Sequence, residues 1–479
     1  MSCKELVTLI WGVEVGRVTV EVGGRLRFAY TEGWRGRDDA VVLSLSMPLA
    51  MAEHTHRPTH AYLSGLLPDN PAVLDRWGKQ FHVSARNAFA LISHVGEDCA
   101  GAAQFLPPER VEAVRAGSPD EVQWLTEGDI EARLRTLRED QGAWRSPGDT
   151  GQFSLAGAQP KTAFLLRDGR FGVPSGRTPT THILKPPLVG RPGHAENEHI
   201  CLALARALGL PAASSEVRRF GGEIAVVVTR YDRAHTAELA AAAAARAAAM
   251  AAAAATADGR DTATAAAGAA DAAVHASTLA ELAKVQPVLR LHQEDMCQAM
   301  GLLPTAKYQS EGGPTPARVV QLLREHSSQP AEDIATFVGA LAFNWLIAGT
   351  DAHAKNYSLL HASGSQVRLA PLYDLASALP LPGVDLHRLR MAMRIGSEYR
   401  IRNIVRRHWE ELAGELSLDA DATVEQVLAM AAEMPARLAH VRDRAIAEGL
   451  DPAVVEKLAE LLFGHIARCQ RALESGAPA

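Results

Sequence analysis

The chain has 479 residues, enough for two or three domains and a sizeable hydrophobic core. Its formal net charge of -6 creates no overall positive field, so DNA contact would need a local patch or a partner, and no membrane is expected as a partner. Five scattered cysteines without a C-x-x-C pair, and an N-terminus without the apolar segment of a secretion signal, predict reduced thiols and a cytoplasmic location.

The first part of the chain predicts a small β-rich unit. Residues 17–30 alternate apolar and polar side chains around Gly23-Gly24, which predicts a β-hairpin. Two prolines bracket the polar residues of the stretch 63–71 and predict a turn before a helical segment at 72–77. Residues 107–150 are charged and rich in proline and glycine, and we interpret them as the connection to a larger domain.

Two features of the next part suggest phosphate binding. Residues 153–166 hold a loop of small residues between strand-like segments, and such a loop can bring backbone N–H groups close to phosphate oxygens. The Walker A pattern is not satisfied, and an ordinary hairpin turn explains the loop equally well. Lys185 ends a short β-type run; a kinase needs one such lysine for the nucleotide phosphates, although a lone lysine there is more often solvated.

A helix and a strand are predicted after this lysine. Apolar residues at helical spacing predict a helix over 195–208, which Gly209 ends. Glu198 could pair with Lys185, as a helix glutamate does in many kinases, but we favour its interpretation as a favourable charge at a helix N-terminus. The β-type run 224–233 follows, and backbone groups near its end could contact an adenine.

Residues 234–280 differ in character, because they are largely alanine with Thr, Gly and Asp. The longest alanine block is interrupted by Arg246 and lacks large apolar side chains, so it is not a convincing membrane span. Alanine favours helix, but such a helix has no wide apolar face with which to dock. We therefore predict an exposed, partly helical or disordered insertion without a chemical role.

The second half carries the strongest chemical motif. An apolar helix is predicted over 334–347, and Asp351 and Asn356 follow with the spacing of a protein-kinase catalytic loop. Asp374 comes after a predicted hairpin, where a kinase places a second metal-binding carboxylate. The remainder is predicted to be mainly helical, and Asp451-Pro452 is typical of the start of the last helix.

Together these motifs resemble the HipA family, the serine/threonine-kinase toxins of bacterial HipBA toxin–antitoxin pairs. The matching stretches are Gly65-Leu66-Leu67-Pro68-Asp69-Asn70, Leu155-Ala156-Gly157-Ala158-Gln159-Pro160-Lys161-Thr162, Thr180-Thr181-His182-Ile183-Leu184-Lys185, Arg230-Tyr231-Asp232-Arg233, Gln293-Glu294-Asp295-Met296, Lys307-Tyr308, Gly312-Gly313-Pro314, Asp351-Ala352-His353-Ala354-Lys355-Asn356 and Tyr373-Asp374. They stand in family order and span most of the chain.

The resemblance implies an α+β protein with a protein-kinase-like two-lobed body, a small N-terminal β-rich subdomain and a mostly helical C-terminal lobe. The expected parts are the N-terminal subdomain (1–110), the nucleotide-binding part (150–233), the alanine-rich insertion (234–285) and the helical catalytic part (286–475).

The resemblance also implies roles for individual residues. Asp351 would be the catalytic base, and Asn356 and Asp374 would hold magnesium. Family members autophosphorylate a serine at the head of the small-residue loop, here Ser154, which ejects the loop and silences the enzyme. The residues expected around ATP are Ala156, Gly157, Ala158, Gln159, Pro160, Lys161, Lys185, Thr229, Arg230, Tyr231, His353, Lys355 and Tyr373. Pro160 departs from the family pattern and removes one backbone N–H from the phosphate loop.

The family implies two partners: glutamyl-tRNA synthetase as substrate, and a small helix-turn-helix antitoxin through which DNA would mainly be contacted. One alternative is a catalytically silent kinase-like corepressor acting with that antitoxin on DNA. A second alternative uses Asp351, His353 and Asp374 as a transition-metal hydrolase site, but it would want a further histidine and leaves the spacing to Asn356 unexplained.

Overall fold

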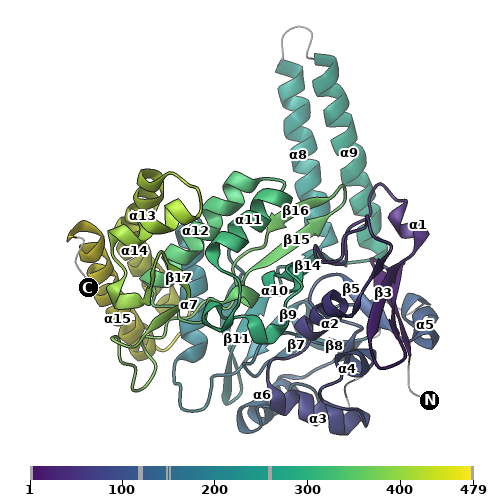
Figure 1. The fold of residues 1–479 in the computed structure, drawn as a ribbon, viewed down its shortest axis with the longest axis horizontal. Helices are drawn as coiled ribbons and strands as arrows, with labels where there is room; N and C mark the ends of the chain where they lie inside the picture. Colours follow the sequence, from purple (N-terminus) through teal and green to yellow (C-terminus); the bar gives the residue numbers. More distant parts are fainter. Residues whose placement is uncertain (1–3, 117–121, 147–148, 150–152, 257–261, 476–479) are drawn as a thin grey trace.

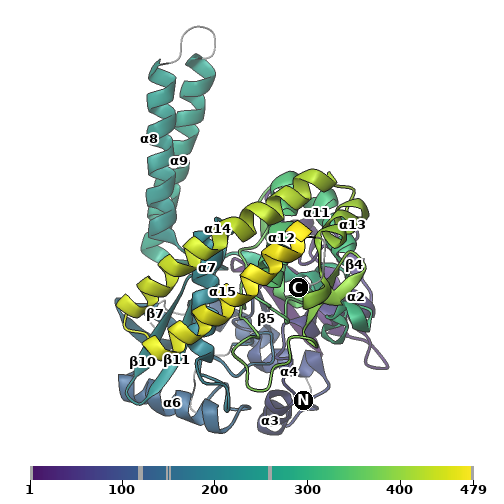
Figure 2. The same cartoon turned by 90° about the vertical axis from the view of Figure 1, so that its left-hand side faces the viewer.

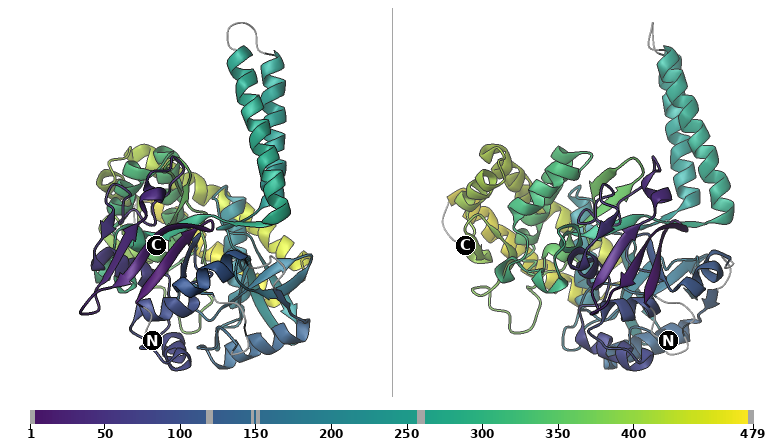
Figure 3. Two further views of the ribbon diagram at one scale, coloured as in Figure 1. Left: turned by 90° about the vertical axis from the view of Figure 1, so that its right-hand side faces the viewer. Right: turned by 45° about the vertical axis from the view of Figure 1, so that its right-hand side comes forward.

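The computed structural model describes residues 4–116, 122–146, 149, 153–256 and 262–475. Its N-terminal part is a five-stranded antiparallel sheet in the order β4-β3-β2-β1-β5, seen face-on in Figure 3. The elements are β1 (Glu5–Ile10), β2 (Val13–Val20), β3 (Leu26–Tyr30), β4 (Glu53–His54), β5 (Ala103–Leu106), α1 (Glu32–Arg35), α2 (His56–Gly65), α3 (Pro71–Phe81), α4 (Ala88–Val95) and α5 (Val111–Ala116). The predicted hairpin is confirmed as β2–β3, and α3 confirms the helix after the proline-rich turn.

A second sheet of six strands, in the order β10-β11-β9-β7-β8-β6, forms the part of the chain that was predicted to bind a nucleotide. Its elements are β6 (Val122–Trp124), α6 (Glu127–Glu139), β7 (Thr162–Arg167), β8 (Arg170–Pro174), β9 (His182–Lys185), α7 (His194–Ala207), β10 (Ser215–Phe220) and β11 (Glu223–Thr229). The interpretation of 107–150 as a plain connection is wrong, because β6 extends this sheet and α6 packs against β10 and β11. Ile130, Leu134 and Leu137 form the buried face of α6.

The C-terminal part is mainly helical, as predicted, and α14 and α15 lie side by side across it (Figure 2). Its helices are α10 (Met296–Ala299), α11 (Pro316–His326), α12 (Pro330–Leu346), α13 (Arg406–Glu415), α14 (Ala420–Ala447) and α15 (Pro452–Ser475). Its strands are β14 (His292–Asp295), β15 (Ser358–Ala362), β16 (Gln366–Leu369), β17 (Arg390–Ile395) and β18 (Glu398–Arg400). Short 3-10 turns are η1 (Pro108–Arg110), η2 (Pro304–Ala306), η3 (Gln309–Glu311), η4 (Ala354–Asn356) and η5 (Ile401–Asn403). The predicted helices over 195–208 and 334–347 are confirmed as α7 and α12.

The alanine-rich insertion forms two antiparallel helices, α8 (Thr236–Thr256) and α9 (Thr262–Val285), which project from the body (Figure 1). Strands β12 (Arg233–His235) and β13 (Val288–Arg290) pair at its root. The helical prediction is therefore confirmed in the described residues. By length and composition, Thr236–Ala254 is the one stretch among them that could cross a membrane, with a mean hydropathy of 1.3.

A buried ionic cluster joins the N-terminal part to the rest of the chain. Asp98 Oδ1 accepts from Arg233 at 2.9 Å and lies 3.4 Å from Arg290 Nε. Asp232 Oδ2 accepts from Arg230 and Arg233, both at 2.8 Å. Burial alone would raise the pKa of Asp98, but the charges of the three arginines lower it well below its usual value. Asp98 is therefore ionised across the physiological range.

We expect Asp98→Asn to destabilise the fold by about 3–5 kcal/mol, because it leaves buried arginines without their partner. Since the folded-state pKa of Asp98 is lowered, its stabilising effect is present above its unfolded pKa and disappears as the pH falls toward the folded value. Urea unfolding followed by tryptophan fluorescence at pH 7 measures the change. Glu53→Gln, which removes an exposed pair with Arg27, is the control and should change stability by less than about 1 kcal/mol.

Candidate active site

The catalytic loop begins where α12 ends. Ala348 adopts a left-handed conformation (φ 53°), and a Cβ on Gly349 would lie 2.4 Å from the Asn344 side-chain oxygen, so glycine is needed there. The Asn356 side chain donates to the backbone carbonyl of Asp351 at 2.7 Å and closes the loop. The Asp351 side chain is 66% exposed, so its carboxylate is accessible from solvent.

Tyr308 orients that exposed carboxylate. Its hydroxyl donates to Asp351 Oδ1 at 2.6 Å, and its ring meets His353 edge-on with centroids 4.9 Å apart. Burial and the neighbouring Asp351 raise the pKa of Tyr308, so the hydroxyl keeps its proton. The sequence analysis assigned Tyr308 no role, although it lies in a stretch that matches the family.

The other catalytic-loop side chains point inward. Lys355 is buried, and its ammonium donates to Asp295 Oδ2 at 3.1 Å and to the Gly65 carbonyl at 3.0 Å. The Tyr373 hydroxyl donates to the Lys355 carbonyl at 2.6 Å. Burial alone would lower the pKa of Lys355. The negative charges of Asp295 and Asp69 have the larger combined effect, so the pKa is raised above its usual value. Lys355 and Tyr373 thus hold the loop in place.

Lys185 joins the two sides of the site. Its ammonium lies 2.7 Å from Glu198 Oε1 and 2.7 Å from Asp374 Oδ1, so the interpretation of Glu198 as a mere helix-end charge is wrong. Burial disfavours the charged form of each group. The carboxylates of Asp374 and Glu198 nevertheless raise the pKa of Lys185. The ammonium groups of Lys185 and Lys161 in turn lower the pKa of Asp374. All three charges depend on this mutual pairing.

The small-residue loop closes over a second lysine. Lys161 donates to the Ala156 carbonyl at 2.9 Å and lies 4.6 Å from the centre of the Trp144 ring. Gly157 has a φ of 105°, a conformation that favours glycine, and a Cβ there would lie 2.5 Å from the Lys161 ammonium and displace it. Burial, with a contribution from Lys185, lowers the pKa of Lys161 to about 8.

The N-terminal part holds this loop from outside. Asp69 donates its backbone N–H to the Gly157 carbonyl at 2.9 Å, and its carboxylate pairs with Lys307 at 3.0 Å. Ser154 is fully buried, and its hydroxyl donates to the Leu66 carbonyl at 2.8 Å. The role of Asp69 was not predicted, because sequence spacing gives no indication of contacts this distant.

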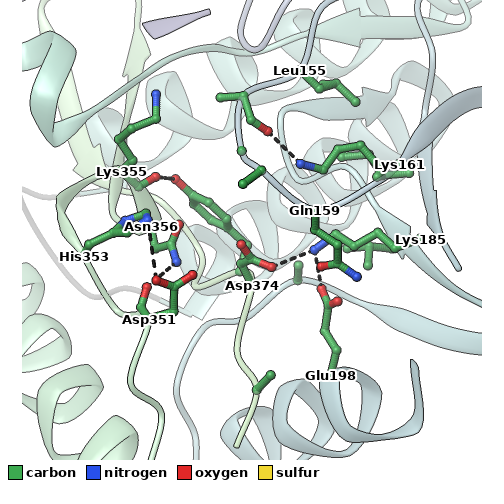
Figure 4. Close-up of a pocket in the computed structure, with 18 of the residues that line it drawn as sticks. Leu155, Gln159, Lys161, Lys185, Glu198, Asp351, His353, Lys355, Asn356 and Asp374 are labelled. Atoms are coloured by element: carbon green, nitrogen blue, oxygen red, sulfur yellow. Dashed lines mark hydrogen bonds and ion pairs between the residues drawn. The ribbon is translucent and has the colours of Figure 1, made fainter. Parts of the chain in front are cut away.

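A cavity of about 650 Å³ unites these features. Figure 4 shows Asp374 between Lys185 and the catalytic-loop side chains Asp351 and Asn356. Ser154 does not line this cavity. All the residues predicted for catalysis and ATP contact do: Ala156, Gly157, Ala158, Gln159, Pro160, Lys161, Lys185, Thr229, Arg230, Tyr231, Asp351, His353, Lys355, Asn356, Tyr373 and Asp374. The Arg230 guanidinium, however, faces the ionic cluster, which leaves the backbone of 229–231 for a nucleotide base.

The oxygen donors of Asn356 and Asp374 fit magnesium, which favours carboxylate, carbonyl and phosphate oxygens and few protein ligands. No cluster of three His, Cys, Asp or Glu side chains suited to a metal occurs in the described part of the chain.

Comparison with known proteins agrees with this geometry. The HipA-like C-terminal domain matches residues 153–438, and the HipA N-terminal domain matches residues 6–106. The putative kinase Y4mE of Sinorhizobium fredii is 34% identical over 410 residues, 85% of this chain and 84% of that protein. The serine/threonine-protein kinase toxin HipA of Shewanella oneidensis is 26% identical over 472 residues, 93% and 90% of the two chains.

A solved structure of Shewanella oneidensis HipA, in complex with HipB and operator DNA, matches with a TM-score of 0.73 at 24% identity and covers 97% of both chains. This match confirms the α+β, protein-kinase-like fold with an N-terminal β-rich part. Because family domains match both halves and a relative shares 34% identity over most of its length, the chain belongs to the HipA family of kinase-like proteins.

Proposed function

We propose that the chain is an ATP- and magnesium-dependent serine/threonine protein kinase. The observation that carries the proposal is the pairing of Lys185 with both Glu198 and Asp374 inside a cavity that Asp351 and Asn356 also line. Phosphoryl transfer depends mainly on positioning and charge neutralisation, and these groups supply both. The presence of the complete set favours an active enzyme over a silent corepressor.

Each group has a defined task in this proposal. Asp351 accepts the proton of the acceptor hydroxyl, while Lys185 and Lys161 bind phosphate oxygens of ATP as point charges. When bound between Asn356 and Asp374, magnesium would neutralise charge on the phosphates. Tyr231 stacks on Tyr373 with ring centroids 5.5 Å apart, which fixes the backbone beside the expected adenine site.

Family resemblance extends the proposal to regulation and partners. We propose Ser154 as an autophosphorylation site and off-switch; its buried hydroxyl would have to leave the Leu66 carbonyl before it could react. Glutamyl-tRNA synthetase is the proposed substrate. A helix-turn-helix antitoxin is the proposed partner, supported by the relative solved with HipB and operator DNA. The cytoplasm is the proposed location.

We expect Asp351→Asn to reduce phosphoryl transfer about 10²- to 10⁴-fold while ATP binding persists, because the variant lacks the general base but keeps the phosphate-binding lysines. Incubation with labelled ATP and magnesium, followed by mass spectrometry, should label the Ser154 peptide in the wild type only. Asp421→Asn, at an exposed position on α14, is the matched control. Equal labelling of Asp351→Asn and wild type would exclude Asp351 as the base.

Tyr308→Phe should lower kcat for ADP formation about 10- to 100-fold and leave the KM for ATP unchanged. The ring contact with His353 is kept, but the exposed Asp351 carboxylate loses the hydroxyl that orients it. Steady-state kinetics measure both constants. Tyr399→Phe removes a tyrosine hydroxyl elsewhere and should behave as wild type. An unchanged kcat in Tyr308→Phe would show that the hydrogen bond has no positioning role.

ATP affinity should be highest below about pH 8 and fall as the pH rises above it, by at most about tenfold per pH unit. The cause is Lys161: its free-state pKa is about 8, so above that value the protein must take up a proton to bind the phosphates. Calorimetric titration with a non-hydrolysable ATP analogue measures the profile. The Lys161→Met variant should bind the ATP analogue more weakly, and its affinity should not fall as the pH rises above 8. If the variant showed the same pH profile as the wild type, Lys161 would not be the group responsible.

A further inference from the structure

A second cavity shares no lining residue with the catalytic cavity and lies where three parts of the chain meet. It has a volume of about 250 Å³ and is lined by residues of the β1–β2 turn and α5, by Arg177 before β9, and by Arg290 and Gln286 at the root of the α8–α9 hairpin. Three of the lining side chains are arginines: Arg115, Arg177 and Arg290. No acidic residue is among the described residues that line it, although Arg115 pairs with Glu112 and Arg290 with Asp98 next to the cavity.

Arg290 belongs to the buried ionic cluster, and that cluster has more cations than anions. Arg230, Arg233 and Arg290 share only Asp98 and Asp232 among the described residues that pair with them. Arg290 Nη1 donates to the Arg177 carbonyl at 2.7 Å and Nε faces Asp98, but Nη2 is buried without a hydrogen-bond partner. A buried guanidinium with an unpaired nitrogen is costly unless an anion compensates it.

The other two arginines are available at the cavity. Arg177 is exposed, and its guanidinium has no ion pair within the described chain. The Arg115 side chain is 38% exposed; it pairs with Glu112 at 3.1 Å, and its Nε donates to the Gly12 carbonyl at 3.4 Å. Both side chains can therefore turn toward a ligand at little cost to the fold.

The other residues that line the second cavity are suited to a small organic ligand. The apolar side chains of Leu9, Val13 and Val114 and the Trp11 ring line it, and Gln104 and Gln286 add polar groups. Trp11 and Gly12 form the two-residue turn between β1 and β2, and both have the positive φ (53° and 80°) that such a hairpin turn requires. The Trp11 indole N–H donates to the Arg290 carbonyl at 2.8 Å, which links the aromatic wall to the arginine.

From these observations we infer a second ligand site in this cavity, for a small phosphorylated anion held by Arg290, Arg115 and Arg177. Guanidinium groups bind phosphate through paired, charge-assisted hydrogen bonds, and the anion would balance the excess cation of the buried cluster. The volume is below that of typical drug-sized pockets, which favours a ligand near the size of a sugar phosphate.

Equilibrium dialysis of the full chain with radiolabelled inorganic phosphate tests the site. A saturating non-hydrolysable ATP analogue with magnesium is present in a parallel arm to occupy the catalytic cavity. The test variant is Arg115→Gln/Arg177→Gln, which changes two side chains that the fold does not bury. The matched control is Arg25→Gln/Arg388→Gln, which removes two arginines that are 73% and 89% exposed elsewhere.

In the arm with the ATP analogue, we expect wild type and control to bind one phosphate, and the Arg115→Gln/Arg177→Gln variant to bind it at least about tenfold more weakly. Without the analogue, the catalytic cavity can bind a further phosphate. Binding at the second site should also raise the thermal midpoint of the wild type, because the ligand favours the folded state. Three results would overturn the inference: no binding at about 10 mM phosphate, equal binding by the test variant with the analogue present, or loss of all phosphate binding when the analogue is present. None of these results depends on kinase activity.

Discussion

One buried ammonium group, that of Lys185, determines the geometry of the catalytic cavity. It stands at the end of β9 and pairs with Glu198 on α7 and with Asp374, 189 residues further along the chain and beyond β16. In a low-dielectric interior, the loss of any one of these groups would leave another charge uncompensated. The distance between the Lys185 amine and the Asp374 carboxylate is therefore fixed by mutual pairing rather than by loop shape.

The catalytic cavity also depends on an element outside the kinase-like body. Residues 66–70, between α2 and α3, satisfy backbone and side-chain groups of the phosphate loop: the Gly157 carbonyl accepts from Asp69, and Ser154 donates to Leu66. The Asp69 carboxylate also pairs with Lys307, which precedes Tyr308, the residue that donates to Asp351. Buried polar groups must find partners, so the N-terminal part completes the phosphate loop and does not simply lie beside it.

Sequence spacing predicted the candidate catalytic residues better than it predicted the residues that hold them in position. Asp351, Asn356 and Asp374 follow recognisable patterns in the sequence, and all three line one cavity. Asp69 and Tyr308 act through contacts that no spacing rule encodes. Glu198 was misinterpreted because sequence alone does not show that its side chain is buried facing a lysine. The α6 helix differs, since its buried positions, Ile130, Leu134 and Leu137, have helical spacing that the charged composition of the segment obscured.

The projecting hairpin shows how a long insertion can leave this arrangement intact. Its two ends are antiparallel neighbours, because Arg233 pairs with Arg290 and His235 with Val288 in the β12–β13 ladder. An insertion between adjacent strand residues adds little closure entropy and does not move the strands apart. Arg233 and Arg290 are also both anchored by Asp98, so the root is fixed by the buried ionic cluster while the alanine-rich arms extend away from the body (Figure 3). The hairpin thus projects from a place where the backbone is held on both sides by the β12–β13 ladder and by Asp98.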